Sequence, residues 1–369
     1  MKRTIFLLLF LIVFTQPLQI RAFELSAESA VLIDAETGRV IYSKNSRERM
    51  GMASTTKIMT ALVALDKYNP DDVVTASYKA SNTEGSSIYL KPGEKMSLEH
   101  VLYGLMLASG NDASVAISEH IAGNEYTFVE YMNRKAANLN LLDTHFENPN
   151  GLSHENHYTT AYDLSQITRE ALKNEKFRQV VSTKNKVLKS LSGENDRYIK
   201  NHNKLLWQYD GCIGVKTGFT KKDGRCLVSA AEKDGITLIA VTLNAPDDWN
   251  DHKKLFDYGF SNLTHKRVIR KGEKAKTVNV NNGVLGSVDC IFSKEISVSV
   301  KKEENVLVKL FVPEVVDAPV KEGQQIGFAK VYVDQVQVDE TSVIASQNID
   351  VTKETKLVQQ FINLFTILI

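Results

Sequence analysis

The chain has 369 residues, of which 43% are hydrophobic and 24% charged, an ordinary composition for a globular protein. This length exceeds what one compact core usually holds, so we expect two folded domains. The 45 basic residues nearly balance the 44 acidic ones, for a formal net charge of +1. Because binding to nucleic acid requires a basic surface, the charge gives no argument for a nucleic-acid partner.

The N-terminal residues have the layout of a secretory signal peptide. The basic start Met1-Lys2-Arg3 precedes an almost entirely apolar run over residues 5–14, and a polar stretch follows that ends at Ala22. The apolar run is shorter than the roughly 20 residues that a bilayer-spanning helix needs. We therefore expect residues 1–22 to be a signal peptide, with an uncleaved anchor as the alternative. Either way, the bulk of the chain is expected to act outside the cytoplasm.

Residues 23–263 have the pattern of one α+β domain. Apolar and β-branched runs predict five strands, at 30–34, 40–42, 211–217, 225–231 and 237–243. Helical periodicity predicts six helices, at 54–65, 98–107, 113–122, 126–139, 161–172 and 254–260. Strands followed by helices and then strands predict an antiparallel sheet with a helical block against it.

The last third of the chain has a different pattern. Valine and isoleucine alternate with polar residues over 264–348, between glycine-containing turns, which predicts a small all-β domain. In residues 349–369, apolar side chains recur every three or four positions, which predicts an amphipathic helix. Its apolar part, about 13 residues, is too short to cross a membrane but long enough to lie in the interface. We expect this helix to associate with the membrane surface; packing against the β domain is the alternative.

The cysteines and histidines indicate no metal site. Three cysteines, Cys212, Cys226 and Cys290, leave at least one thiol unpaired. Cys226 lies near the turn of the predicted hairpin and Cys212 far from it, so we expect three free, mostly buried thiols. His154 and His157 have no third ligand nearby, and we interpret them as surface loop residues. We expect no metal and no cofactor.

The first motif that carries chemistry is Ser54-Thr-Thr-Lys57, at the start of a predicted helix. A serine hydroxyl is a weak nucleophile and needs a base within hydrogen-bonding distance. Ser54 and Lys57 are three positions apart, so on one helix they share a face. Lysine can act as the base only if burial or a neighbouring cation lowers its pKa. Alone, the motif is equally typical of a helix cap.

Two further motifs follow. Ser109-Gly110-Asn111 supplies a hydroxyl that can relay a proton and an amide that can orient the lysine and hold a peptide group. Lys216-Thr217-Gly218 ends a predicted strand with a cation, a hydroxyl and a residue without a side chain. Such a strand edge can receive an extended peptide by backbone pairing. Each tripeptide alone is also typical of an ordinary turn or cap.

The three motifs together, in this order, resemble the set found in penicillin-binding proteins and class A β-lactamases. The chain is similar to low-molecular-mass penicillin-binding proteins, the serine D-Ala-D-Ala carboxypeptidases of the S11 peptidase family. The resemblance covers roughly residues 25–262, with the β domain and terminal helix also matching the usual tail of the family. The segments that carry it most clearly are 31–38, 53–62, 105–114, 146–152 and 214–220.

The resemblance implies a role for each matched position. Ser54 is expected to be acylated by the penultimate D-Ala of a peptidoglycan stem peptide, and Lys57 to act as the general base. Ser109 is expected to relay protons, and Asn111, Lys216, Thr217 and Gly218 to bind substrate. The backbone N–H groups of Ser54 and Phe219 are expected to form the oxyanion hole. β-Lactams are the expected inhibitors, at the extracytoplasmic face of the bacterial cytoplasmic membrane.

Two alternatives remain at this stage. A class A-like β-lactamase shares the first and third motifs, but it typically has aspartate where this chain has Gly110, and it lacks a second β domain. A catalytically silent penicillin-binding wall sensor would keep the fold and lose turnover. Against the sensor, every motif side chain is present.

Overall fold

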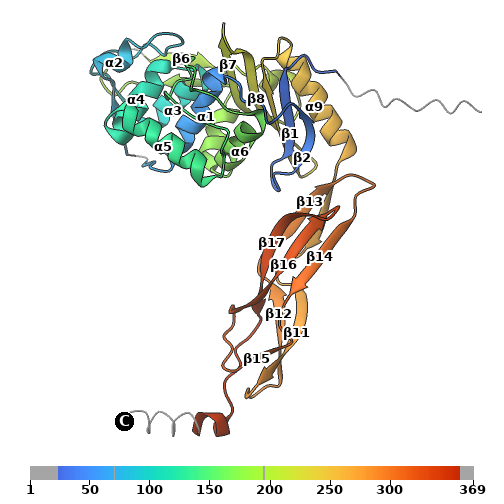
Figure 1. The fold of residues 1–369 in the computed structure, drawn as a ribbon. Helices are drawn as coiled ribbons and strands as arrows, with labels where there is room; N and C mark the ends of the chain where they lie inside the picture. Colours follow the sequence, from blue (N-terminus) through green and yellow to red (C-terminus); the bar gives the residue numbers. More distant parts are fainter. Residues whose placement is uncertain (1–23, 70, 194–195, 358–369) are drawn as a thin grey trace, which may run out of the picture.

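The computed structural model describes residues 24–357 except 70, 194 and 195. The chain forms an α+β domain followed by an elongated β domain, with the described C-terminal end at the far tip (Figure 1). The predicted signal peptide, 1–22, and most of the predicted C-terminal helix, 349–369, lie outside the described residues. The described part of that segment is 349–357, and its start differs from the prediction. Ile349 and Val351 form β-bridges with Val320 and Gly283 of the β domain, so the helix begins only at residue 353. No helix in the described part of the chain is long and apolar enough to cross a membrane.

The first domain is built on one five-stranded antiparallel sheet. Its order is β2-β1-β9-β8-β7, with β1 (Ser29–Asp34), β2 (Val40–Lys44), β7 (Cys212–Thr220), β8 (Gly224–Lys233) and β9 (Ile236–Leu243). All six residues of β1 are buried, because alternate side chains enter different cores. Val31 and Ile33 face one core, and Ala30 and Leu32 face the other.

Helices cover both faces of this sheet. The larger block packs on one face, and α9 (Asp248–Asn262) packs on the other against β8 and β9. The block comprises α1 (Lys57–Leu65), α3 (Leu98–Leu107), α4 (Asn111–Ala122), α5 (Glu125–Asn138), α6 (Ala161–Leu172) and α7 (Glu175–Ser182). The predicted α+β arrangement of sheet and helical block is therefore confirmed.

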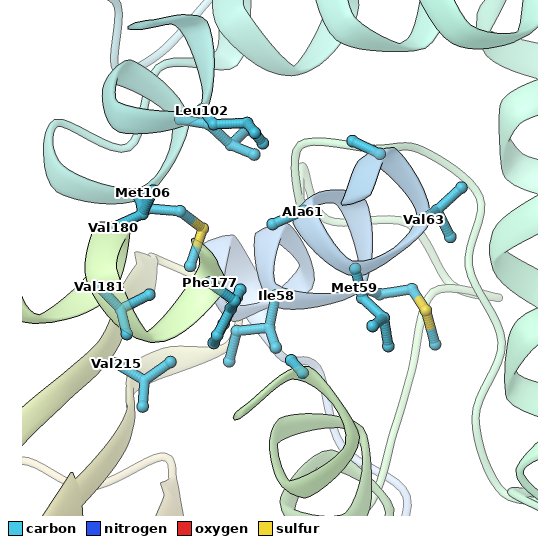
Figure 2. Close-up of a cluster of buried hydrophobic side chains, with 14 of the residues drawn as sticks. Ile58, Met59, Ala61, Val63, Leu102, Met106, Phe177, Val180, Val181 and Val215 are labelled. Carbon is cyan, nitrogen blue, oxygen red and sulfur yellow. The ribbon is translucent and has the colours of Figure 1, made fainter. Parts of the chain in front are cut away.

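Helix α1 lies at the centre of the helical block, and all nine of its residues are buried. Figure 2 shows Ile58 from α1 among Met106 of α3, Phe177 and Val181 of α7, and Val215 of β7. Burying a side chain of this size contributes about 1.5–3 kcal/mol. The start of α1 is therefore held between the helices and strand β7.

Some boundaries differ from the prediction for local reasons. Residues 54–65 do not form one helix, because a 3₁₀ turn, η1 (Ala53–Thr56), precedes α1. The hydroxyls of Thr55 and Thr56 donate to the carbonyls of Met52 and Ala53, which competes with α-helical bonding. Lys-Thr-Gly lies within β7 rather than at its end, and α4 begins at Asn111 rather than residue 113.

Several short elements carry little periodicity and escaped prediction, as did α7. They are β3 (Val73–Thr75), α2 (Tyr78–Ser81), β4 (Lys95–Ser97), β5 (Asn185–Leu188), β6 (Arg197–Lys200) and α8 (Leu205–Gln208). β3 pairs with β4, and β5 with β6, as two-stranded sheets. The β5–β6 and α8 segments lead into β7, so they border the strand that carries Lys216.

The second domain confirms the predicted all-β pattern. A six-stranded sheet has the order β14-β16-β17-β12-β11-β15, and β10 pairs with β13. The strands are β10 (Thr264–Ile269), β11 (Lys274–Asn281), β12 (Ser287–Phe292), β13 (Ile296–Val300), β14 (Val306–Phe311), β15 (Val315–Asp317), β16 (Gln325–Val333) and β17 (Val336–Ala345). Valine and isoleucine fill its own core, separate from those of the first domain.

One arginine joins the two domains. Arg39, in the turn between β1 and β2, makes an ion pair of 2.5 Å with Glu304 and donates to the carbonyl of Ser299 at 2.6 Å. Both charged side chains are mostly buried, at 14% and 10% exposed. Charge-assisted hydrogen bonds of this kind contribute about 1.5–3 kcal/mol when well satisfied. The contact therefore ties the edge of the first sheet to the base of the β domain.

The three cysteines are free, as predicted. Cys226 and Cys290 are buried, and Cys212 is partly buried. Cys212 pairs in register with Ala231 and Cys226 with Gly218, so the two thiols lie at opposite ends of the β7–β8 hairpin. Burial raises the pKa of Cys226 to about 12, so this thiol stays protonated at neutral pH.

Candidate active site

Ser54 and Lys57 meet at the junction of η1 and α1. The Lys57 side chain is fully buried, and its Nζ donates to the hydroxyl Oγ of Ser54 at 3.0 Å. The same Nζ donates to Oδ1 of Asn111 at 2.7 Å and to the carbonyl oxygen of Asn150 at 2.5 Å. An ammonium has three donors, and here each has one oxygen partner.

The geometry determines which partner changes role when Lys57 loses a proton. A neutral amine has two donors and one lone pair. The amide of Asn111 donates from Nδ2 to the carbonyl of Glu84 at 2.6 Å, so its Oδ1 faces Lys57 and can only accept. The carbonyl of Asn150 can also only accept. The lone pair of neutral Lys57 is therefore directed at the hydroxyl of Ser54, which has a proton to give.

Electrostatics favour that neutral form. Burial holds the pKa of Lys57 well below its usual range, the charge of Lys216 lowers it further, and Asp112 opposes both. Asp112 is committed elsewhere: its carboxylate accepts the backbone N–H groups of Ile88 and Leu90. A lysine with a depressed pKa beside a serine hydroxyl can act as a general base at neutral pH.

Ser109 and Asn111 enter the site from the loop between α3 and α4. Both are buried, at 4% exposed. Ser109 has a φ of +61°, a left-handed conformation that costs a non-glycine residue free energy and is concentrated at functional sites. Asn111 is the first residue of α4, and its backbone N–H donates to the carbonyl of Ser86 at 2.7 Å. The loop thus places the amide of Asn111 against Lys57 and Ser109 in the wall of the cleft that Ser54 also lines.

Strand β7 forms the opposite wall. Lys216 is buried, its Nζ donates to the carbonyl of Thr217 at 2.7 Å, and burial lowers its pKa to about 7. A Cβ added at Gly218 would lie 3.0 Å from the backbone nitrogen of Ser54, so a side chain there would push the strand off the 3₁₀ turn. Because β7 is an edge strand, one side of its backbone is open to pair with an extended ligand.

A cleft of about 290 Å³ lies between these elements. Of the residues predicted from sequence, Ser54, Ser109, Thr217, Gly218 and Phe219 line it, while Lys57 and Lys216 lie buried beneath. The predicted site residues are therefore brought together. Further lining residues are Ser86, His202, Arg225, Asp248 and Trp249.

Two contributors were not foreseen. The carbonyl of Asn150 holds Lys57, and His157, interpreted from sequence as a surface residue, is only 4% exposed. The surface interpretation of His157 is therefore wrong. Two hydrogen bonds hold His157 inside the domain: its Nδ1 accepts the backbone N–H of Glu147 at 3.0 Å, and its Nε2 contacts the hydroxyl of Thr56 at 2.8 Å.

His157 buttresses the turn that carries the nucleophile. Since its Nδ1 accepts, Nε2 bears the proton and donates to Thr56, whose hydroxyl in turn donates to the carbonyl of Ala53 at 2.8 Å. Burial lowers the pKa of His157 to about 3, so the ring stays neutral. No spacing rule connects residue 157 with residue 56, and only the folded contact reveals it.

Comparisons with known proteins agree with this geometry. A family model described as D-alanyl-D-alanine carboxypeptidase, Peptidase S11, matches residues 15–247, more than half of the chain. The chain belongs to this family. A second model, the C-terminal domain of penicillin-binding protein 5, matches residues 264–351. The predicted family and the predicted class, a serine-type D-Ala-D-Ala carboxypeptidase, are therefore confirmed.

Relatives of this S11 carboxypeptidase cover both domains. The D-alanyl-D-alanine carboxypeptidase DacF of Bacillus subtilis (strain 168) is 37% identical over 333 residues, 87% of this chain and 85% of that protein. DacD of Escherichia coli (strain K12) is 31% identical over 345 residues, 88% of this chain and 87% of that protein. Penicillin binding protein 5 from Haemophilus influenzae superposes with a TM-score of 0.74 at 27% identity, covering 89% of this chain and 98% of that one.

Replacing His157 should slow acylation without a change in pH profile. Without the ring, the hydrogen-bond chain to Thr56 and Ala53 is broken, and displacing a catalytic group by about 1 Å can cost about 100-fold in rate. We expect His157→Leu to lower the rate of acylation by fluorescent penicillin roughly 10- to 100-fold. His157→Gln, which keeps a donor for Thr56, should recover part of the rate. The exposed neighbour His154→Gln is the control, and an acylation rate of His157→Leu equal to that of this control would contradict the buttress.

Proposed function

We propose that this S11 carboxypeptidase removes the terminal D-alanine from peptidoglycan pentapeptide stems through an acyl-enzyme on Ser54. The observation that carries the proposal is the set of bonds at Nζ of Lys57, which leaves Ser54 as the only partner with a proton to give. In acylation, Lys57 takes this proton while Oγ attacks the penultimate D-Ala carbonyl. Ser109 relays it to the leaving amine, and water later hydrolyses the ester.

The proposed oxyanion hole consists of the backbone N–H groups of Ser54 and Phe219. Gly218 packs against the backbone of Ser54, which brings the following residue of β7 beside the nucleophile. Donors fixed before the reaction stabilise the developing oxyanion without reorganisation, and losing one such donor costs about 3–4 kcal/mol. Only the backbone of Phe219 is used, in keeping with its ring being 64% exposed.

We assign substrate binding to Asn111, Lys216, Thr217 and Gly218. Asn111 positions the acyl peptide group, β7 pairs with the extended stem, and Thr217 binds the terminal carboxylate in the field of Lys216. A penicillin, which carries a carboxylate and a reactive carbonyl, would enter the same cleft and acylate Ser54. Stable acylation, over minutes or longer, distinguishes this enzyme from a β-lactamase.

We further propose the chain's organisation and location. Residues 1–22 form a signal peptide, 23–263 the carboxypeptidase domain, 264–348 the all-β domain and 349–369 a membrane-associating segment whose amphipathic helix begins at residue 353. The boundary between residues 263 and 264 is supported by the family model that matches residues 264–351 and by the change from helix to strand at Thr264. The enzyme would then work at the extracytoplasmic face of the cytoplasmic membrane, attached to its surface.

Replacing the nucleophile tests the central proposal. Ser54→Ala should abolish both labelling by fluorescent penicillin and D-Ala release from diacyl-Lys-D-Ala-D-Ala, because no acyl-enzyme can form. The circular dichroism spectrum and thermal midpoint should stay close to those of the unmodified protein, since Ser54 is only partly buried. The control is Ser153→Ala, because Ser153 is an exposed serine on a loop outside the 3₁₀ turn that carries Ser54. Labelling of the Ser54 variant would refute the assignment, and penicillin binding without D-Ala release by the unmodified chain would indicate a sensor.

Substrate affinity should weaken as pH rises through about 7. Lys216 is charged below its pKa of about 7, so its attraction for the carboxylate is full at lower pH and disappears as the pH rises. Above pH 7, protonating Lys216 on substrate binding costs about 1.4 kcal/mol per pH unit. KM should therefore rise by up to about tenfold per pH unit. The rise ends at the pH where the enzyme with neutral Lys216 binds substrate as tightly as the enzyme that must first protonate it. An otherwise identical substrate ending in D-alaninamide is the control. It should show a high KM with little change between pH 6 and 9, and parallel profiles for both substrates would contradict the role of Lys216.

The proposed anchor can be tested with vesicles of phosphatidylglycerol and phosphatidylethanolamine. Phe361 and Gln360 are neighbours on opposite faces of the predicted helix. Burying a phenylalanine contributes about 1.5–3 kcal/mol, so Phe361→Asp should reduce co-sedimentation with vesicles at least about tenfold. Gln360→Asp adds the same charge to the polar face and should have a much smaller effect. Equal binding by both variants would contradict attachment through this helix.

A further inference from the structure

The residue before the nucleophile has a strained backbone. Ala53 has a φ of +46°, in the left-handed region, and its side chain is fully buried. This conformation is unfavourable for a residue that has a Cβ, and it persists only where the surrounding structure enforces it. Such strain is concentrated at functional sites, and here it immediately precedes Ser54. The contacts of Ala53 therefore determine how the nucleophile is presented.

Two side chains hold the peptide groups on either side of Ala53. The N–H of Ala53, which belongs to the peptide shared with Met52, donates to Oδ2 of Asp223 at 3.2 Å. The carbonyl of Ala53, which belongs to the peptide shared with Ser54, accepts the hydroxyl of Thr56 at 2.8 Å. Because each peptide is planar, only the φ and ψ rotations of Ala53 relate one to the other. The two hydrogen bonds therefore fix the direction of the backbone N–H of Ser54.

Asp223 reaches the 3₁₀ turn from the β7–β8 hairpin. It lies in the turn between the two strands, where its backbone N–H donates to the hydroxyl of Thr220 at 2.9 Å. The approach is close, because a Cβ at Gly51 would clash with the carboxylate of Asp223. The exposed Ser153 also donates to Oδ2, at 3.1 Å, but water can replace a donor at that position. The bond to Ala53 is therefore the one through which Asp223 acts on the nucleophile.

The contact is strong enough for this task. A charged acceptor forms a stronger hydrogen bond with a backbone N–H than a neutral acceptor does, and the free energy is of the same order as the strain at Ala53. The described residues that line the cleft do not include Asp223, so its carboxylate does not contact substrate. Its effect on the reaction must pass through the backbone of the 3₁₀ turn.

We propose that Asp223 is a positioning residue that sets the geometry of the oxyanion hole. The inference rests on the proposed function, in which the backbone N–H groups of Ser54 and Phe219 receive the oxyanion. Ser54 belongs to the 3₁₀ turn and Phe219 to β7, so the hole is divided between two elements. Asp223 belongs to the same hairpin as Phe219 and binds the residue before Ser54, which joins the two donors in one unit. Such donors stabilise the transition state because they are held in place before the reaction.

The first test measures how fast, and how completely, fluorescent penicillin labels the full chain. Asp223→Ala removes the acceptor, and we expect the second-order rate of labelling to fall about 10- to 100-fold, as for a catalytic group displaced by about 1 Å. The final extent of labelling should not change, because every molecule keeps Ser54. Asp223→Asn keeps a carbonyl oxygen as acceptor and should retain at least about a third of the rate.

The matched control for this test is Asp210→Ala. The Asp210 side chain is 98% exposed, and it precedes β7 at the end of the hairpin far from the turn. Its loss removes the same charge from the same hairpin without touching the 3₁₀ turn. The labelling rate of this variant should stay within about twofold of that of the unmodified chain.

Steady-state kinetics separate positioning from substrate binding. With diacyl-Lys-D-Ala-D-Ala, Asp223→Ala should lower kcat by a factor similar to the fall in labelling rate and leave KM within about twofold, since the oxyanion forms only in the transition state. A boronic acid analogue of the substrate forms a tetrahedral adduct on Ser54, with one oxygen in the oxyanion hole. Its inhibition constant should rise by the same factor as kcat/KM falls.

Each contrary outcome has a distinct meaning. A labelling rate of Asp223→Ala within about twofold of the control would overturn the inference, and so would an equal loss in Asp223→Asn, which keeps the acceptor. A raised KM with unchanged kcat would overturn it in favour of a binding role. A lower extent of labelling and a lower thermal midpoint, at an unchanged rate, would overturn it in favour of a purely stabilising role. An unmodified chain that neither forms the acyl-enzyme nor releases D-Ala would overturn the proposed function itself.

Discussion

The ammonium of Lys57 has no access to water, and three oxygens replace its hydration shell. One comes from the 3₁₀ turn, one from the start of α4 and one from the loop at Asn150. Each partner belongs to a segment far from the others in the chain, so the side chain is satisfied only when the sheet, the helical block and the loop are assembled. A buried charge that lost one of these partners would cost several kcal/mol. The same packing that stabilises this domain therefore also fixes the geometry of the active site.

The same burial supplies the reactivity. Lys57 and Lys216 are both buried, and Asp112, the acid that raises the pKa of Lys57, accepts hydrogen bonds from the backbone of residues 88 and 90. Among the described residues, no carboxylate is a hydrogen-bond partner of either lysine. Burial lowers the pKa of both lysines, and the charge of Lys216 lowers that of Lys57 further, since like charges in a low dielectric repel. Nucleophile activation thus needs no dedicated carboxylate or imidazole base, and the neutral His157 adds only a hydrogen bond.

Sequence patterns predicted the parts that depend on local repetition. The strands of the sheet, the long helices and the three motifs follow from periodicity, and the spacing of Ser54 and Lys57 places both at one helix start. Tertiary contacts determine the rest. The 3₁₀ turn depends on threonine hydroxyls that bond back to the main chain, and the burial of His157 depends on Thr56, about a hundred positions away. The hollow lined by Tyr198, Lys200, Lys204 and Trp207 follows from no sequence motif, because these side chains come together only when the segment from β6 to α8 folds.

The elongated β domain gives the molecule a long axis, with the cleft-bearing domain at one end and the described C-terminal tip at the other (Figure 1). Arg39 fastens the two at their junction. If the far tip is attached to a surface, the length of the β domain sets the distance between the cleft and that surface. The cleft then reaches substrate only at about that distance. Polymer strands nearer to the surface or farther from it would not be cleaved, because the cleft could not reach them. A longer or shorter β domain, with the same catalytic residues, would therefore direct the enzyme to polymer at a different distance from the surface.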